Sequence, residues 1–281
     1  MKKEQNILVL GGKGKTGRRV ANRLVEKGQT VRIGSRSEKP SFDWEDSSTW
    51  KGALQGMESV YITFQPDLAV PGAKEAIEGF TNLAVKSGVR KVVLLSGKGE
   101  QEAEECERIV MNSGLDWTIV RASWFNQNFS ESFFLDPILA GLVALQKIEA
   151  QVTYVDANDF ADVVVASLLD DKHNSEIDVL SGPRTLAFTD VVREIYAATG
   201  REIQFTPISM KEYNAMMKEF NLPDDYLWLI NYLFEEVLVE SNSMVTNDIE
   251  KVLGREPIDF TTYANEVAKS HVWDGVGMER I

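Results

Sequence analysis

The sequence is poor in the residues that build disulfides and metal centres. Among its 281 residues it has one cysteine, Cys106, and two histidines, His173 and His271. A single cysteine excludes an internal disulfide and fits the reducing conditions of the cytoplasm. The histidines have no partner at metal-ligand spacing, and no Gly-x-Ser-x-Gly elbow occurs. We therefore expect no metal site, no hydrolase-type nucleophile and a cytoplasmic location.

Positive charge and long apolar runs are also scarce. Lysine and arginine number 30 against 43 aspartate and glutamate residues, which gives a formal net charge of −13. Because nucleic-acid backbones attract basic surfaces, this balance argues against nucleic-acid binding as the main activity. No run reaches the ~18 apolar residues of a transmembrane helix. Residues 1–5 lead directly into an apolar segment, which leaves no room for a signal peptide. We expect neither a membrane nor a nucleic-acid partner.

A glycine-rich turn stands between an apolar run at residues 6–10 and a helical pattern that continues to Gly28. Its glycines, Gly11, Gly14 and Gly17, have G-x-x-G-x-x-G spacing. A pyrophosphate binds well at a helix N-terminus, and glycine lets the chain turn tightly beside it. The alternative is a tight turn without a ligand. A Walker-type loop is disfavoured because no Gly-Lys-Ser/Thr ending stands at the required spacing. The residues expected to bind a dinucleotide here are Gly11, Lys13, Gly14, Lys15, Thr16 and Gly17.

The end of the next strand, at residues 30–34, indicates which dinucleotide is bound. Chains that bind NAD usually carry Asp or Glu at this point to hold the ribose 2′-hydroxyl. Here Ser35 and Arg36 follow the strand, and a guanidinium with a hydroxyl favours a 2′-phosphate. In the alternative, Arg36 is solvated and Glu38 or Asp43 contacts the ribose. We predict NADP(H), with NAD(H) as the less favoured cofactor.

Strand-like and helical segments alternate through the first half of the chain. Near-continuous apolar strands separated by helices are typical of a parallel sheet covered on both faces. Right-handed crossovers then give an α/β fold with a doubly wound parallel sheet, the NAD(P)-binding Rossmann arrangement. After residue 36 the expected elements are strands at 59–64, 91–96 and 117–121 and helices at 73–86 and 100–112.

The second half of the chain changes character and becomes mostly helical beyond Ser209. We expect the Rossmann core at residues 1–153. Residues 154–281 are expected to hold the remaining core elements and a smaller C-terminal α+β lobe, which lies over the carboxyl ends of the strands, where ligands bind in such sheets. The elements expected before Ser209 are helices at 159–169 and 188–198 and short strands at 177–180 and 203–205.

Further motifs extend along the chain. They are SGLDWTIVR at 113–121, SWFNQNF at 123–129, VDANDFAD at 155–162, LSGP at 180–183 and VLGREP at 252–257. Together with the glycine-rich turn, they resemble the NmrA-like family of atypical short-chain dehydrogenases. Within it, the chain is most similar to the branch of NAD(P)H-dependent azo- or quinone-reductase-like proteins and festuclavine dehydrogenases. Two positions depart from the family pattern: Lys13 replaces the usual Thr or Ser, and Ala122 replaces a frequent Pro. Lys13 either reaches a phosphate or is solvated.

The resemblance implies roles for residues that follow the strands. The loop after 59–64 would pass the central part of the cofactor, and Ser96 stands where short-chain dehydrogenases place their active-site serine. An aromatic pair with an amide suits a planar substrate stacked beside the nicotinamide. The alternatives are a solvated Lys98 and a purely structural Trp124 and Phe125. The expected cofactor contacts are Phe64, Gln65, Pro66, Ser96 and Gly97, and the expected substrate pocket is Lys98, Trp124, Phe125 and Asn128.

The sequence names no proton donor. Ordinary short-chain dehydrogenases use a tyrosine with a lysine four residues further on, and none of the seven tyrosines here has one. The helix that would carry this dyad begins with an acidic run at residues 100–107. We expect that run to be a solvated helix start, because carboxylates are favourable at helix N-termini; a catalytic role is the alternative.

Two functional interpretations follow. The first is an NADPH-dependent reductase of a planar or conjugated small molecule, such as a quinone, azo compound, imine or enone, with its catalytic residues unknown. The second is a non-enzymatic redox sensor, implied by family members that bind the dinucleotide and regulate a protein partner. The acidic surface is compatible with a basic protein partner.

Overall fold

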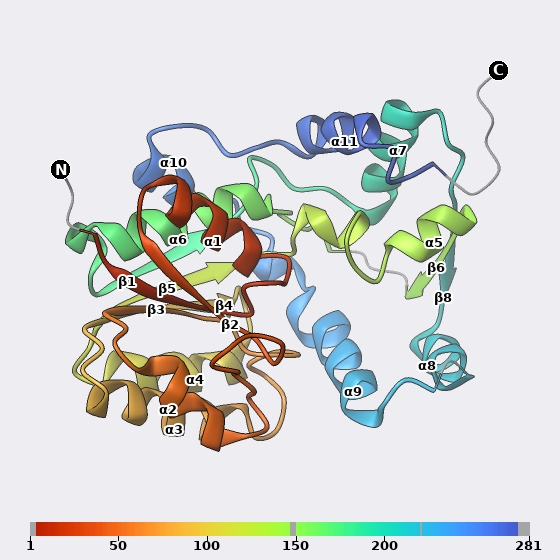
Figure 1. The fold of residues 1–281 in the computed structure, drawn as a ribbon. Helices are drawn as coiled ribbons and strands as arrows, with labels where there is room; N and C mark the ends of the chain where they lie inside the picture. The colour runs from red at the N-terminus through yellow and green to blue at the C-terminus, as the bar shows by residue number, and fades with distance from the viewer. Residues whose placement is uncertain (1–3, 147–149, 220, 275–281) are drawn as a thin grey trace. The chain divides into compact units, whose positions relative to one another are not determined.

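The computed structural model describes residues 4–146, 150–219 and 221–274 (Figure 1). The chain forms two compact units, and neither is one continuous piece of chain. The first unit contains Met1–Ala122, Ala157–Leu180 and Asn247–Arg255, and the second contains Ser123–Asp156, Ser181–Thr246 and Glu256–Ile281.

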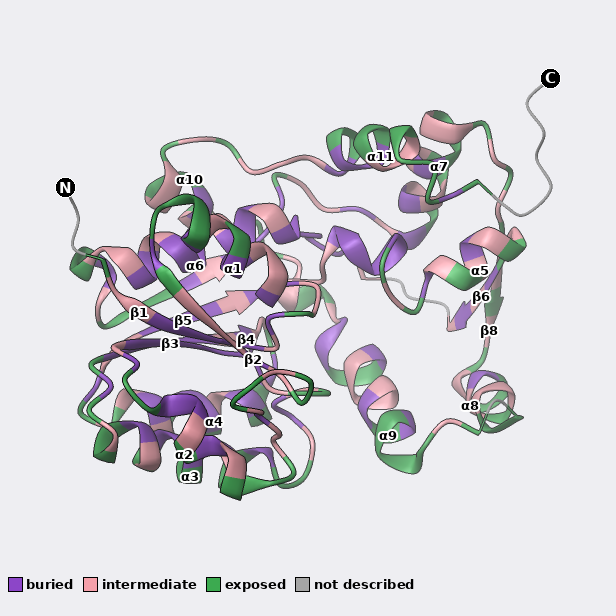
Figure 2. Ribbon diagram, in the orientation of Figure 1, coloured by how far each residue is buried: buried purple, intermediate pink, exposed green. Residues whose placement is uncertain are grey.

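The first unit is built on a six-stranded sheet with strand order β2-β1-β3-β4-β5-β7, in which every neighbouring pair is parallel. The central strands are almost wholly buried (Figure 2). Such burial explains why they are near-continuous apolar runs. The strands are β1 (Asn6–Leu10), β2 (Thr30–Gly34), β3 (Ser59–Ile62), β4 (Lys91–Gly97), β5 (Asp116–Ala122) and β7 (Glu176–Leu180).

Helices cover both faces of this sheet (Figure 1). On one face lie α2 (Trp50–Leu54), α3 (Ala73–Lys86) and α4 (Gln101–Met111), and on the other lie α1 (Gly17–Glu26), α6 (Ala157–Leu169) and α10 (Asp248–Leu253). This arrangement confirms the doubly wound Rossmann fold expected from the alternation of elements. No helix among the described residues is long and apolar enough to cross a membrane.

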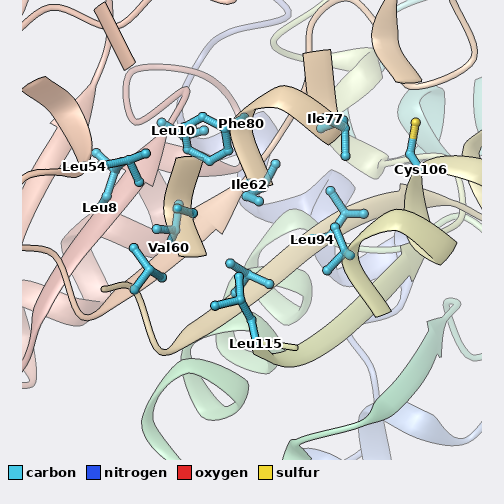
Figure 3. Close-up of a cluster of buried hydrophobic side chains, with 14 of the residues drawn as sticks. Leu8, Leu10, Leu54, Val60, Ile62, Ile77, Phe80, Leu94, Cys106 and Leu115 are labelled. Carbon is cyan, nitrogen blue, oxygen red and sulfur yellow. The ribbon is translucent and has the colours of Figure 1, made fainter. Parts of the chain in front are cut away.

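Alternate side chains of the central strands form a core with α2, α3 and α4 (Figure 3). Leu8, Val60 and Ile62 are fully buried, as is Phe80 of α3. Their spacing of two residues along each strand places them on the same face of the sheet. Burial of one such side chain contributes about 1.5–3 kcal/mol to the free energy of unfolding, so this core holds α3 and the loops beside it in place.

The late segment that contains α10 closes the edge of the sheet at β7. The carboxylate of Asp248 accepts a hydrogen bond from the backbone N–H of Val179 at 2.9 Å. Arg255, just beyond the helix, pairs with Asp159 at 2.6 Å and with Asp162 at 2.7 Å, both on α6. An edge strand otherwise presents unpaired N–H groups to solvent. These contacts make residues 247–255 part of the Rossmann unit, although they lie far along the chain.

The second unit contains a two-stranded parallel sheet and its own aromatic core. Phe129 stacks on Phe134 with 4.9 Å between ring centroids, and the indole of Trp273 donates to the carbonyl of Phe129 at 2.7 Å. The strands are β6 (Leu142–Gln146) and β8 (Gln204–Ile208), and the α-helices are α5 (Leu135–Ala140), α7 (Phe188–Thr199), α8 (Met210–Glu219), α9 (Asp224–Tyr232) and α11 (Phe260–Lys269). Single helical turns lie at Asn126–Phe129, Leu233–Val237 and Glu240–Asn242, and in the first unit at Ser47–Thr49 and Asp171–His173.

These units divide the chain differently from the expected boundary at residue 153. Residues 123–153 belong to the second unit, whereas 157–180 and 247–255 belong to the first. The reason lies in the sheet, because β7 pairs with β5 and α6 packs against α1. The sixth strand of the sheet is therefore supplied after the chain has already contributed to the second unit.

Asp178 on β7 is a destabilising group that predicts a pH dependence. Its side chain is 8% exposed and one carboxylate oxygen has no hydrogen-bond partner among the described residues. Burial, with the nearby charges of Asp248 and Glu176, raises its pKa to about 6. The folded protein therefore retains a proton that the unfolded chain releases, and stability falls as the pH rises from about 4 through 6.

Asp178→Asn should abolish that fall and raise the free energy of unfolding by about 1–3 kcal/mol at pH 8. Thermal unfolding measured between pH 4 and pH 8 checks it. The matched control is Glu26→Gln, an exposed carboxylate at the end of α1, which should leave the profile unchanged. A gain for Asp178→Asn that is equal at all pH values would contradict the assignment.

Candidate functional site

The residues expected to hold a dinucleotide lie on loops that follow four parallel strands of the first unit. The glycine-rich turn follows β1, Ser35 and Arg36 follow β2, residues 64–66 follow β3, and Ser96 and Gly97 end β4. In a parallel sheet the carboxyl ends of neighbouring strands meet at one edge, and ligands of open α/β sheets bind outside that edge. The structure therefore brings all the predicted cofactor contacts to one edge of one sheet.

The glycine-rich turn brings the start of α1 into contact with the end of β1. Gly11 has a φ of +58°, in the left-handed region, and its carbonyl accepts the N–H of Gly14 at 2.8 Å. A Cβ on Gly17 would lie 2.3 Å from that same carbonyl oxygen. Only glycine permits this approach. Thr16 has a structural contact, since its hydroxyl lies 2.9 Å from the buried hydroxyl of Tyr61.

The loop after β2 holds two cationic side chains in different ways. Lys13, in the glycine-rich turn, binds to this loop. Its ammonium lies 2.7 Å from Ser37 Oγ and 2.7 Å from a carboxylate oxygen of Glu38. Arg36 is exposed, and the described part of the chain offers its guanidinium no hydrogen bond or ion pair. The carboxylate of Glu38 thus already has a partner, while the Arg36 guanidinium faces solvent.

The loop after β3 combines a packed aromatic residue with exposed neighbours. The ring centroid of Phe64 lies 5.0 Å from that of Trp44, and the Trp44 indole donates to the carbonyl of Thr63 at 3.0 Å. Gln65 and Pro66 are exposed. The amide nitrogen of Gln65 lies 3.8 Å from where a Cβ on Gly14 would stand, so the Gln65 side chain borders the glycine-rich turn.

Ser96 donates its hydroxyl to a buried carboxylate at the other side of the strand end. The acceptor is Glu107 of α4, at 2.6 Å, and Arg121 of β5 binds both oxygens of Glu107 at 2.9 and 2.6 Å. Ser96 is 3% exposed and Glu107 is completely buried. The two-point contact with Arg121 compensates the burial of the Glu107 charge, and Ser96 adds a third hydrogen bond.

A second buried carboxyl lies at the start of the same helix. Glu100 is 8% exposed, and its side chain is hydrogen-bonded to that of Asp67, which follows Pro66 in the loop after β3. A Cβ on Gly97 would lie only 1.9 Å from a Glu100 carboxylate oxygen. Burial, and next the charge of Asp67, raises the pKa of Glu100. Burial also raises the pKa of Asp67, while the hydrogen bond opposes that rise.

The expectation that residues 100–107 form a solvated helix start is therefore wrong for Glu100 and Glu107. It holds for Glu102 and Glu105, which are exposed. The burial of Glu107 could have been predicted from the sequence, because Ala103, Glu107 and Val110 have the spacing of one helix face. The Asp67–Glu100 contact had a weaker signal, namely a carboxylate in each of two loops that follow adjacent strands.

The predicted substrate residues are divided between the two units. Lys98 belongs to the first unit, where its backbone N–H donates to the carbonyl of Ala122 at 2.9 Å. Burial lowers the pKa of its ammonium group. Trp124, Phe125 and Asn128 belong to the second unit.

Trp124 stands at the outer side of an aromatic cluster in the second unit. Its ring packs edge to face on Phe133 at 6.1 Å and on Phe234 at 5.7 Å. Trp124 is half-buried, whereas Phe133 is 55% exposed. Phe125 is also half-buried, and Asn128 is buried. The cluster is therefore both part of a core and an accessible apolar surface.

The Ser96–Glu107–Arg121 contact makes a prediction about stability. Glu107→Gln removes the charge that compensates the half-buried Arg121 guanidinium and should lower the free energy of unfolding by about 2–4 kcal/mol. Urea unfolding checks this value. The control is Glu105→Gln on the same helix, which breaks only an exposed pair with Lys74 and should change the free energy of unfolding far less. Equal losses in both variants would contradict the buried ion pair.

Comparison with known proteins places these features in a family. A family model described as NAD(P)H-binding matches residues 11–171. YesF, an uncharacterized oxidoreductase of Bacillus subtilis, is 28% identical over 94% of this chain and 96% of its own. A festuclavine dehydrogenase of Aspergillus fumigatus is 25% identical over 92% of this chain and 97% of its own. NAD(P)H azoreductase of Xenophilus azovorans is 25% identical over 94% of this chain and 97% of its own.

Solved structures agree on the fold. Triphenylmethane reductase of Citrobacter sp., solved with NADP(H), superposes with a TM-score of 0.73 at 15% identity and covers 94% of this chain and 99% of that one. NmrA, a negative transcriptional regulator solved with NAD, gives 0.72 at 15% identity, with 99% of both chains covered. The resemblance drawn from the motifs is confirmed, and a nicotinamide dinucleotide is the cofactor class.

Proposed function

We propose that this chain, which belongs to the NAD(P)H-binding family, is an NADPH-dependent reductase of planar or conjugated small molecules. The observation that carries the proposal is the full-length similarity to proteins named as a festuclavine dehydrogenase and an azoreductase. Quinones, azo compounds, imines and enones are the acceptor classes. The low cysteine content favours the cytoplasm as the site of the reaction.

The contacts around the glycine-rich turn support the cofactor assignment. The Gly11–Gly17 approach, which leaves no room for a Cβ on Gly17, brings the turn to the N-terminus of α1, where a pyrophosphate binds in such folds. Gln65 borders the same turn. Lys15, Pro66, Ser96 and Gly97 complete the proposed contacts, although the Ser96 hydroxyl is engaged by Glu107. The bound dinucleotide supplies hydride.

The loop after β2 supports NADP over NAD. Glu38, one of two carboxylates that would otherwise serve a ribose 2′-hydroxyl, is held by Lys13. Asp43, the other, accepts the backbone N–H of Glu45 at 3.1 Å. Arg36 and the Ser35 hydroxyl remain on the exposed loop and suit a 2′-phosphate.

The aromatic cluster of the second unit supports the acceptor class. A planar conjugated molecule gains most from flat aromatic surfaces, and Trp124 with its exposed neighbour Phe133 provides one. In our proposal Trp124, Phe125 and Asn128 contact the acceptor.

The second candidate is a dinucleotide-dependent regulator of a protein partner. It is favoured by the structural likeness to NmrA, named as a negative transcriptional regulator, and by the absence of a Tyr-x-x-x-Lys dyad from the sequence.

Oxidation of NADPH separates the two candidates. Loss of absorbance of the reduced cofactor, followed against a panel of quinones, azo dyes and enones, should show turnover with at least one class. Tight binding of NADP(H) combined with no turnover on any acceptor would reject the reductase and leave the regulator.

Cofactor choice is tested by Arg36→Ala. Loss of a charged hydrogen-bond donor to the 2′-phosphate should weaken NADPH binding by about 10- to 100-fold and leave NADH binding nearly unchanged. Fluorescence titration with both cofactors measures the two dissociation constants. Lys39→Ala, an exposed cation on the same loop, is the matched control. Equal losses for both cofactors would show that Arg36 does not read the 2′-phosphate.

A further inference from the structure

One lysine joins the glycine-rich turn to the loop after β2. The Lys13 ammonium lies 2.7 Å from Ser37 Oγ and 2.7 Å from a carboxylate oxygen of Glu38. The side chains of Lys13 and Glu38 are 57% and 40% exposed. An ion pair in contact with water contributes little to folding stability. Removal of this pair should therefore leave the fold intact and change mainly what the loop presents to a ligand.

The loop that carries Glu38 has a defined backbone. The carbonyl of Ser35 accepts the backbone N–H of Glu38 at 3.2 Å and that of Phe42 at 3.0 Å. The hydroxyls of Ser35 and Ser37 lie 3.2 Å apart. The carboxylate of Glu38 therefore belongs to the same short turn as the guanidinium of Arg36, two residues before it.

This turn lies where the adenosine ribose of a dinucleotide would be recognised. The two strands that lead into the turn and into the glycine-rich turn, β2 and β1, are paired residue for residue. A Cβ on Gly12 would lie 2.7 Å from the side chain of Ile33 in β2, and one on Gly17 would lie 2.3 Å from the Gly11 carbonyl oxygen. Such close approach fits a dinucleotide whose pyrophosphate lies at the glycine-rich turn and whose ribose lies beside the end of β2.

The charged groups of the turn have opposite effects on a ribose 2′-phosphate. Arg36 attracts it, whereas the carboxylate of Glu38 repels it and is suited to accept a hydrogen bond from a ribose 2′-hydroxyl. The contact with Lys13 neutralises Glu38 and occupies one of its oxygens. The charge that Lys13 supplies therefore decides which of the two effects prevails.

We propose that Lys13 is a specificity-determining residue that favours NADP(H) by binding Glu38, not by binding the phosphate. The inference rests on the proposed function for the choice of NADP and deepens it by naming the group that withdraws the carboxylate. Lys13 is a positioning residue in this role, because it acts on the cofactor through Glu38. Arg36 is the group that contacts the 2′-phosphate.

A double-mutant cycle separates this role from direct contact between Lys13 and the phosphate. Lys13→Met leaves Glu38 unneutralised and should weaken NADPH binding by about 3- to 10-fold, while NADH binds at least as tightly as to the wild type. Glu38→Gln should bind NADPH at least as tightly as the wild type does. The double variant should regain the wild-type affinity for NADPH within about twofold, because the carboxylate that Lys13 neutralises is gone. Fluorescence titration with each cofactor measures the dissociation constants.

Three results of this cycle would overturn the inference. A double variant that binds NADPH as weakly as Lys13→Met would show that Lys13 contacts the phosphate itself. Equal losses for NADPH and NADH in Lys13→Met would show a structural role in the turn, and unchanged binding of both would show no role. The control is Lys269→Met, which breaks an exposed pair with Glu266, also 2.7 Å long, and removes the same charge elsewhere in the chain. It should leave both affinities at their wild-type values.

Two adenosine fragments isolate the effect without the nicotinamide. Adenosine 2′,5′-bisphosphate carries the 2′-phosphate, and 5′-AMP lacks it. Lys13→Met should lower the ratio of their affinities by the same factor as the ratio for NADPH and NADH. Salt should shrink this change, because the pair is exposed to solvent. Isothermal titration calorimetry at about 0.05 and 0.5 M KCl measures both ratios, and a fragment ratio that is the same in Lys13→Met and wild type would overturn the inference.

None of these measurements requires turnover, so a protein without reductase activity is tested equally well. A wild type that prefers NADH would reject the proposed cofactor. The role of Lys13 would be rejected separately, by a ratio of NADPH to NADH affinity that Lys13→Met does not lower or that the double variant does not restore.

Discussion

Parallel pairing of six strands is the constraint on which the rest of the first unit depends. Parallel strands point the same way, so the loops that follow them emerge at one edge. This geometry gathers the glycine-rich turn, Arg36, Gln65 and Gly97 from four separate stretches of sequence. The carboxyl groups of Asp67 and Glu100 meet for the same reason, since β3 and β4 are adjacent in the sheet. The common strand direction therefore brings together both the proposed cofactor contacts and the two carboxyl groups.

Two glutamates at α4 are buried, and they have different partners. Glu107 is bound by two hydrogen bonds from Arg121 and by one from Ser96. Glu100, the residue before the helix, lies beside Asp67, and burial and the Asp67 charge raise its pKa. The two buried glutamates thus lie in opposite electrostatic surroundings.

Much of the fold could be predicted because its signals are local. Buried parallel strands are near-continuous apolar runs, and the spacing of the glycines at 11, 14 and 17 indicates the turn after β1. The pairing of β6 with β8 was not predictable, since Leu142 meets Gln204 across 62 residues and short strands of mixed polarity carry no period. The burial of Glu107 was visible in helical spacing, whereas its partner Arg121 was not. Membership of residues 123–153 in the second unit depends on long-range packing that no local pattern records.

The absence of the tyrosine–lysine dyad changes what α4 contributes to this fold. In the ordinary dyad, a helix interior presents a phenol whose pKa is lowered by a neighbouring cation. Here two buried tyrosines, Tyr61 of the first unit and Tyr154 of the second, have pKa values raised by burial, and the hydroxyl of Tyr61 is hydrogen-bonded to that of Thr16. Neither phenol suits proton transfer near neutral pH. A carboxyl group with a raised pKa approaches the same working range from the opposite side. The start of α4 thus carries a buried carboxyl group, Glu100, whose pKa is raised by burial and by the charge of Asp67.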